Sequence, residues 1–237
     1  MSPSKATPPG NRLIAALSNR NRQQFMASCD HVELKIAAVL SEPGERVRHV
    51  YFPLTGFISL ITALDDGARL EVGIVGDEGM LGTSLVLGIH TSSQHALVQG
   101  AGAALRMTAA LFAVQCRQMR PLQQQMNGYL HVLMSQLAQM AACTHYHPVE
   151  ARLARWLLMT RDRAHSDEFL LTHEFLAFML GVRRVGITQA ASELQGRGLI
   201  RYRRGHIAVL DAAGLKKASC GCYQQALNLY DQTLGSP

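Results

Sequence analysis

The chain has 237 residues, of which 48% are apolar and 17% charged, with a formal net charge of +6. This length suits one large domain or two small ones, and the apolar fraction permits a packed core and excludes global disorder. We expect neither a secretory signal nor a membrane span, because no sufficiently long apolar run occurs. The five cysteines do not suggest a disulfide scaffold, so we expect a cytoplasmic chain with reduced thiols.

The first half of the chain has the pattern of an all-β domain. Residues 1–12 are rich in Ser, Pro and Gly and predict a disordered tail, which a helix follows at 13–27. Strand-like runs then alternate with Gly and Asp turns, at residues 31–40, 49–64, 68–75 and 95–107. Such spacing is typical of an antiparallel sandwich or barrel, and we assign 13–120 to a jelly-roll domain.

A long helix is expected at 121–146, because the apolar period changes there to that of a helix. Its a/d stripe consists of Met126, Leu130, Leu133, Leu137 and Met140. A helix of this length would be about 39 Å long, more than one small domain can cover, which favours pairing with a second copy. The alternative is packing against its own domain. Pro148 predicts a break, so we place the domain boundary near residue 146.

Residues 171–210 combine two short helices, a glycine turn and two short strands. Thr172 suits the N-cap of the first helix, Gly181 supplies the turn, and the second helix begins near Arg183. The apolar positions of this second helix available for packing are Val185, Ile187, Ala191 and Leu194. Strands at 199–200 and 207–210 follow, so the segment predicts a helix-turn-helix with a β-hairpin wing.

Positive charge is concentrated in the same segment, where residues 183–204 carry a net +5 of the chain's +6. Its six arginines are Arg183, Arg184, Arg197, Arg201, Arg203 and Arg204. A guanidinium fork binds guanine or a phosphate in bidentate fashion. Positions that can meet bases are Arg183, Arg184, Thr188 and Gln189, and Arg201, Arg203 and Arg204 of the wing suit phosphates. Double-stranded DNA is therefore the expected partner, because a merely solvated basic face does not explain the turn and wing around the arginines.

The motifs LTHEFLAFMLGVRR and LQGRGLI resemble the winged helix-turn-helix of the Crp/Fnr family of bacterial transcription regulators. The resemblance covers about residues 13–222. It implies an α+β fold with an N-terminal jelly roll like the family's cyclic-nucleotide-binding domain, a dimerisation helix at 121–146 and a DNA-binding domain at 147–237. It further implies a homodimer on a two-fold symmetric operator, with RNA polymerase as another partner.

By position, the resemblance implies a phosphate contact for Thr172, recognition-helix roles for Arg183, Arg184 and Gln189, and a wing role for Arg203. Many family members carry Arg-Glu where this chain has Arg184-Val185. We therefore do not expect the half-site that is standard in the family.

The effector motifs depart from the family more strongly. Candidate pocket residues are Gly79, Met80, Leu81, Gly82, Gln94 and His95. Cyclic-AMP-binding members resemble Gly-Glu-Leu-Gly and Arg-Ser-Ala, and here Met80 and Gln94-His95-Ala96 lack both charged ligands. We therefore do not expect cyclic AMP to bind in its usual mode. Two alternatives remain: the protein has no effector, or it binds a different ligand that is apolar or haem-like. An iron–sulfur cluster is not expected either, because Cys29 is the one cysteine near the N-terminus.

Two alternatives compete with this interpretation. Cys143 and His147, together with Cys220 and Cys222, could form a soft-metal or redox site, although their spacing matches no zinc module. The other is a cupin-like jelly-roll enzyme, which needs clustered histidines inside the strands. The histidines of the predicted strands are scattered, so we expect no enzyme activity.

Overall fold

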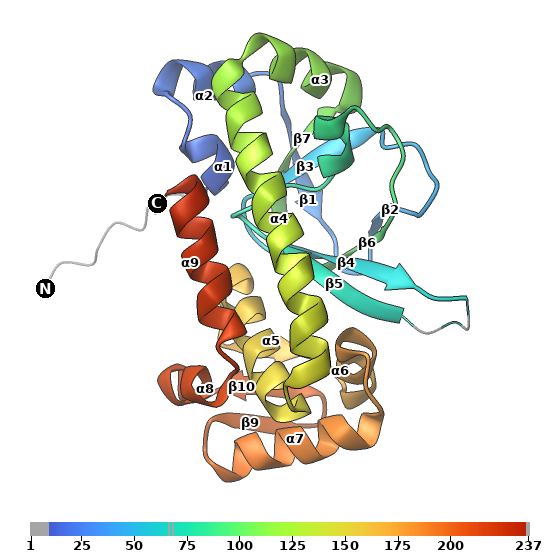
Figure 1. Cartoon of the computed structure of the whole chain (residues 1–237), viewed down its shortest axis with the longest axis vertical. Helices are drawn as coiled ribbons and strands as arrows, with labels where there is room; N and C mark the ends of the chain where they lie inside the picture. The colour runs from blue at the N-terminus through green and yellow to red at the C-terminus, as the bar shows by residue number, and fades with distance from the viewer. Residues whose placement is uncertain (1–9, 66, 68, 236–237) are drawn as a thin grey trace, which may run out of the picture.

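The computed structural model describes residues 10–65, 67 and 69–235, whose arrangement is shown in Figure 1. It confirms the predicted α+β class. Two antiparallel sheets face each other in the N-terminal half, and a small third sheet lies among the C-terminal helices. Within the described residues, no helix is both long and apolar enough to cross a bilayer.

The two large sheets form the jelly-roll sandwich. One sheet has the order β1 (Asp30–Leu34), β7 (Gly102–Thr108), β3 (His49–Pro53). The other has the order β2 (Val39–Ser41), β6 (His95–Gly100), β4 (Phe57–Ala63), β5 (Arg69–Val75). Side chains between them form an apolar core of Leu34, Ile58, Leu60, Val75, Leu81, Ala96, Val98 and Ala104.

Three of the predicted strand runs are each two strands that belong to different sheets. The chain changes sheet near Ala37, Gly56 and Ala101. Where the chain changes sheet at Gly56, its backbone lies very close to the end of β6. A Cβ on Gly56 would be only 2.4 Å from the Gly100 carbonyl oxygen. Glycine is required there both for this approach and for its φ of +74°.

Helices cover the outer face of the β1-β7-β3 sheet. They are α1 (Arg12–Ala15), α2 (Asn19–Met26), α3 (Ala109–Gln118) and the first turns of α4 (Arg120–Tyr146). The single helix expected at 13–27 is two helices, because the Ser18 hydroxyl accepts a hydrogen bond from the Asn21 amide and starts α2.

The tail predicted at 1–12 is too long. Asn11 is buried, caps α1, and donates hydrogen bonds to the carbonyl oxygens of Pro53 (3.1 Å) and Gly79 (2.7 Å). The fold therefore begins by Asn11, and residues 1–9 of the predicted tail lie outside the described residues.

The C-terminal half starts after His147-Pro148, close to the predicted boundary. Its elements are α5 (Val149–Ala164), β8 (Glu168–Leu170), α6 (His173–Leu180), α7 (Arg184–Gly196), β9 (Ile200–Arg203), β10 (His206–Val209), α8 (Ala212–Ala218) and α9 (Cys222–Leu234). The predicted hairpin is part of a three-stranded sheet, since β8 pairs with β10.

The last helix of the segment predicted as the DNA-binding domain, at 147–237, also packs against the N-terminal half. Figure 1 shows α9 returning along α4 toward the N-terminal helices. Tyr230 donates a hydrogen bond to the Glu78 carbonyl oxygen (2.8 Å), and Leu234 lies so close to Gly128 that a Cβ there would be 2.8 Å away. The side chains of α9 thus complete the core around α4.

The two halves share a core. Phe57, Ile61 and Ile74 of the β4–β5 face pack into the same apolar cluster as Trp156 and Leu157 of α5. Two polar links are buried in this contact. The Trp156 indole donates to Glu71 (2.6 Å), and the Arg163 guanidinium pairs with Glu78 (2.7 Å).

Candidate nucleic-acid interface

Helices α6 and α7 form the predicted helix-turn-helix. The Thr172 hydroxyl accepts a hydrogen bond from the Phe175 amide (3.1 Å) and caps α6, and Gly181 ends α6 with a φ of +61°. Arg183 is the N-cap residue of α7 and Arg184 its first residue. The buried face of α7 consists of Ile187, Ala190, Ala191 and Leu194.

The opposite face of α7 is open to solvent. Arg183, Arg184, Thr188 and Gln189 are all exposed, and all four were predicted as DNA contacts. Val185, which we expected to pack inside, is 60% exposed. Its place beside Arg184 on the first turn puts it on the solvent side, so sequence analysis missed an apolar group on this surface.

The wing is a tight hairpin. Arg204 and Gly205 at its tip have φ values of +50° and +83°, the left-handed conformation of a two-residue hairpin turn. Arg201 and Arg203 are exposed and alternate with Tyr202, so both point to the same side of β9. The Tyr202 ring stacks on His173 at 4.3 Å between centroids, and this contact fixes the wing against α6.

Charge on this surface is unbalanced. Within the described part of the chain, no carboxylate oxygen lies within 4.0 Å of the guanidinium groups of Arg183, Arg184, Arg201, Arg203 or Arg204. Arg197 differs, because it pairs with Glu150 at 2.6 Å. These five arginines, which have no acidic partner among the described residues, belong to the recognition helix and the wing.

Thr188 is engaged within the protein. Its hydroxyl donates to the Arg184 carbonyl oxygen (3.1 Å) and lies 3.0 Å from Nδ1 of His173. Burial and the nearby Arg184 charge lower the pKa of His173, which keeps this imidazole neutral at pH 7. His173, which the sequence did not single out, thus joins α6, α7 and the wing.

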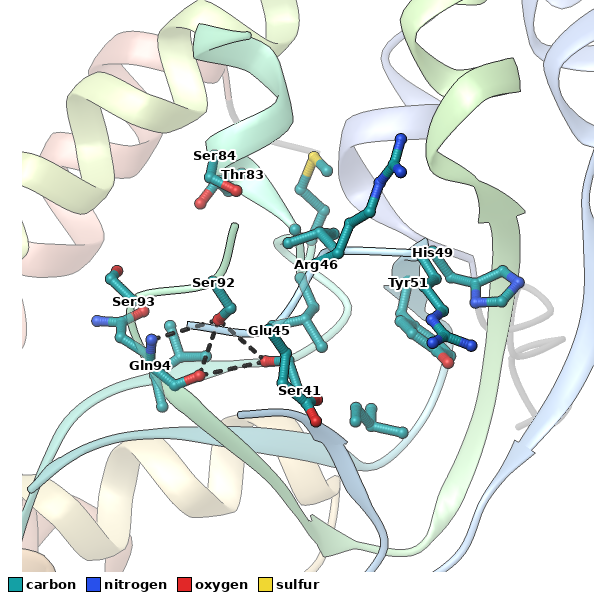
Figure 2. A pocket seen from close by; sticks show the side chains of 17 residues that line it. Ser41, Glu45, Arg46, His49, Tyr51, Thr83, Ser84, Ser92, Ser93 and Gln94 are labelled. Carbon is teal, nitrogen blue, oxygen red and sulfur yellow. Dashed lines mark hydrogen bonds between the residues drawn. The ribbon is translucent and has the colours of Figure 1, made fainter. Parts of the chain in front are cut away.

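A cavity of about 360 Å³ opens in the sandwich, as Figure 2 shows. Of the predicted pocket residues, Met80, Leu81, Gly82 and Gln94 line it. Gly79 and His95 do not. A Cβ on Gly79 would lie 2.0 Å from the Tyr129 hydroxyl, and His95 pairs with Glu42 at 2.7 Å.

The pocket contains charged residues that the motifs did not reveal. Arg46 and Arg48 line it, together with Glu45 and with hydroxyl groups of Tyr51 and Ser92. The Ser92 hydroxyl donates to the Gln94 carbonyl oxygen (2.8 Å), one of the hydrogen bonds drawn in Figure 2. The two arginines come from the segment before β3, far in sequence from Gly79 to Gly82. In the sequence, the alternation of Arg46 and Arg48 with Val47 was the one pattern that could have indicated charged residues at the pocket.

Residues 151–218 match the family model of the Crp-like helix-turn-helix domain. These residues therefore form a helix-turn-helix DNA-binding domain of the Crp type, and the protein is a transcription regulator of the Crp/Fnr type. No curated protein matches its sequence.

Solved structures show the same fold over most of this chain. FixK2 from Bradyrhizobium japonicum has a TM-score of 0.68 at 13% identity, over 81% of this chain and 98% of FixK2. The c-di-GMP responsive global regulator CLP of Xanthomonas campestris has a TM-score of 0.65 at 17% identity, over 81% and 99%. A Crp/Fnr-family transcriptional regulator from Thermus thermophilus has a TM-score of 0.63 at 20% identity, over 80% and 98%.

The residues of the predicted apolar stripe on α4 differ in their exposure to solvent, so not all of them can contact a partner. Met126 is fully buried in the chain's own core, so its prediction as a dimer contact is wrong. Leu130, Leu133 and Met140 are half-buried, and Leu137 is 42% exposed. Met134, which was not predicted, is the most exposed large apolar residue of the same region, at 69%.

The α4 face borders an apolar groove of about 340 Å³, which Leu130, Leu133, Met134 and Leu137 line on one side. The other side is lined by Leu87, the last residue of the short helix η1 (Thr83–Leu87), and by Ile89 just after it, which are 66% and 51% exposed.

The four predicted metal-ligand candidates do come together. Cys143, His147, Cys220 and Cys222 place their ligand atoms within 4.8 Å of one another.

Proposed function

We infer that this regulator binds a two-fold symmetric DNA operator as a homodimer, with α7 in the major groove. The exposed N-terminal turn of α7 carries this inference, since Arg183 and Arg184, which have no acidic partner among the described residues, lie there beside an apolar side chain. A positive, solvent-exposed helix start framed by a basic wing suits the groove and the phosphates beside it.

Different residues suit different parts of the duplex. The forks of Arg183 and Arg184 fit O6 and N7 of guanine, and Gln189 fits adenine. Val185 offers an apolar contact for a thymine methyl group, in place of the acidic side chain usual in the family. Thr172, Arg201, Arg203 and Arg204 suit phosphates. Thr188 acts by fixing His173 and Arg184.

Cyclic AMP in its usual mode is not part of the proposal. Met80 and Gln94 stand at the pocket where the family's cyclic-AMP binders have charged ligands. The positive groups of the pocket, Arg46 and Arg48, come from a different strand connection and are exposed at its rim. Contact with RNA polymerase remains an expectation from the resemblance.

Two arginine variants test DNA recognition. With the best duplex selected from a random pool, Arg184→Ala should lose about 1–3 kcal/mol of binding and relax the preference at one base pair. Arg203→Ala should weaken binding to all duplexes alike and reduce the salt slope by about one unit. Fluorescence anisotropy over a salt series measures both.

Arg197→Ala is the matched control, because it removes the same charge from an arginine that already pairs with Glu150. It should leave base preference unchanged. A flat salt response of the unmodified protein, or no preferred duplex, would contradict the proposal.

The dimer is proposed to form through the exposed α4 face and the rim of its groove. Met134→Glu should place two carboxylates near the two-fold axis and raise the dimer dissociation constant about 100-fold or more, since like charges at an interface cost several kcal/mol. Sedimentation velocity measures it. Ile36→Glu, at a residue 66% exposed on a distant turn, should leave the dimer intact. Equal effects of the two variants would argue against this face.

A further inference from the structure

A cluster of three thiols and one imidazole lies where the two halves of the chain meet. Cys143 is in the last turn of α4, and His147 is its C-cap residue. Cys220 lies in the link between α8 and α9, and Cys222, on the other side of Gly221, is the first residue of α9. The three cysteines are buried and form a small core of their own, with Ala151 packed against it.

The four ligand atoms lie within 4.8 Å of one another, and two of their separations match those of a tetrahedral metal site. Sγ of Cys143 lies 3.6 Å from Sγ of Cys220, and Sγ of Cys222 lies 3.6 Å from Nδ1 of His147. In a tetrahedral zinc site, neighbouring ligand atoms are about 3.5–3.8 Å apart, as follows from Zn–S and Zn–N bond lengths. A disulfide requires about 2.0 Å between sulfurs, so the cysteines are not bonded to each other.

The positively charged side chains near the cluster also favour an anionic group at this position. Arg152 is buried, and no carboxylate oxygen lies within 4.0 Å of its guanidinium in the described part of the chain. Its guanidinium donates a hydrogen bond to the Leu180 carbonyl oxygen, a neutral acceptor that does not offset its charge. Three thiolates and a divalent ion would carry a net −1, which Arg152 and the neighbouring Arg155 can offset.

A cation would let all three thiols of the cluster ionise together, because metal binding replaces the protons of the ligating cysteines.

We propose that Cys143, His147, Cys220 and Cys222 bind one zinc ion, which ties the C-terminal end of α4 to the segment between α8 and α9. Three thiolates and one imidazole with no open position constitute a structural, closed site. The main chain passes between the halves at 147–148 and returns at 219–221, and the ligands flank both crossings. The ion therefore fixes the DNA-binding helices relative to α4. Zinc binding does not depend on the DNA-binding proposal.

Metal analysis of the purified full-length protein tests the site. After expression with added zinc and purification without chelators under reducing conditions, we expect one zinc per chain. Cys222→Ser should lose most of it, whereas Cys222→His supplies another zinc ligand and should retain it. Cobalt substitution should give thiolate-to-cobalt charge-transfer bands, which Cys222→Ser abolishes.

Cys29→Ser is the control, because Cys29 is half-buried after α2 and outside the cluster. It should keep the full metal content. Metal far below one per chain in the unmodified protein, or equal metal in Cys222→Ser and the unmodified protein, would overturn the proposal. A Cys143–Cys220 disulfide without metal in the freshly purified protein would overturn it too. Since metal content is measured without DNA, failure here leaves the DNA-binding result unaffected.

Discussion

Replacing Arg163 with methionine should destabilise the folded protein by about 3–5 kcal/mol, because it leaves the Glu78 carboxylate buried without its cation. The guanidinium of Arg163 lies 2.7 Å from Glu78, and the two side chains are only 10% and 13% exposed. The same guanidinium donates a hydrogen bond to the Met159 carbonyl oxygen (2.9 Å). Urea denaturation at pH 7 measures the free energy of unfolding.

Arg161 offers a matched control two residues away. It pairs with Asp167, and these side chains are 37% and 56% exposed. Arg161→Met should therefore cost less than about 1 kcal/mol, as exposed ion pairs generally do. Equal losses in the two variants would mean that the Arg163–Glu78 pair contributes no more than a surface contact.

Glu71 should make the free energy of unfolding decrease as the pH rises. Glu71 is 2% exposed on β5, and burial raises its pKa from 4.5 to about 7. Hydrogen bonds from Ser59 (2.5 Å) and Trp156 (2.6 Å) lower the pKa of Glu71, but by less than burial raises it. The charges of Arg163 and Arg155 also lower this pKa.

The sign follows from proton binding. Between pH 4.5 and about 7 the folded state holds more protons at Glu71 than the unfolded state does, so the free energy of unfolding decreases with rising pH. The stabilisation from Glu71 is fully present below pH 4.5, the pKa of this carboxyl in the unfolded chain. It is lost as the pH rises through about 7, its pKa in the folded protein. The total change is about 3 kcal/mol.

Glu71→Gln isolates this term, because the amide keeps an acceptor for the Trp156 indole and carries no charge. The free energy of unfolding of the variant, minus that of the unmodified protein, should rise by about 3 kcal/mol from pH 4.5 to 8. Other titrating groups, including Asp77, whose pKa burial raises, are common to both proteins and cancel. Parallel pH curves would show that Glu71 does not titrate in this window.

Much of the DNA-binding surface could be predicted because its elements depend on local chemistry. The Thr172 cap, the left-handed turn at Gly181 and the arginines at the start of α7 are properties of adjacent residues. Val185 shows the limit of such reasoning. Its side chain suits packing, but its helical phase relative to Ile187 places it on the exposed side.

The long helix shows a different limit. A 3.5-residue stripe predicts an apolar face, but α4 has two apolar faces with different partners. Met126 is covered by the chain's own core, with Phe112 and Tyr230 in the same cluster, whereas Met134 and Leu137 remain exposed. Periodicity alone does not separate these faces, because α9, which carries Tyr230, is about 100 residues away in sequence.

The class of fold, the helix-turn-helix and the location of most of the net charge could be predicted from the amino-acid order, because each depends on residues within a few turns of one another. Three features could be found only in the folded chain: which strand joins which sheet, that Arg46 and Arg48 line the pocket, and that Cys143 meets Cys220, 77 positions later. These contacts are long-range. They arise from strand pairing across the sandwich and from the return of α9 along α4, which no local pattern encodes.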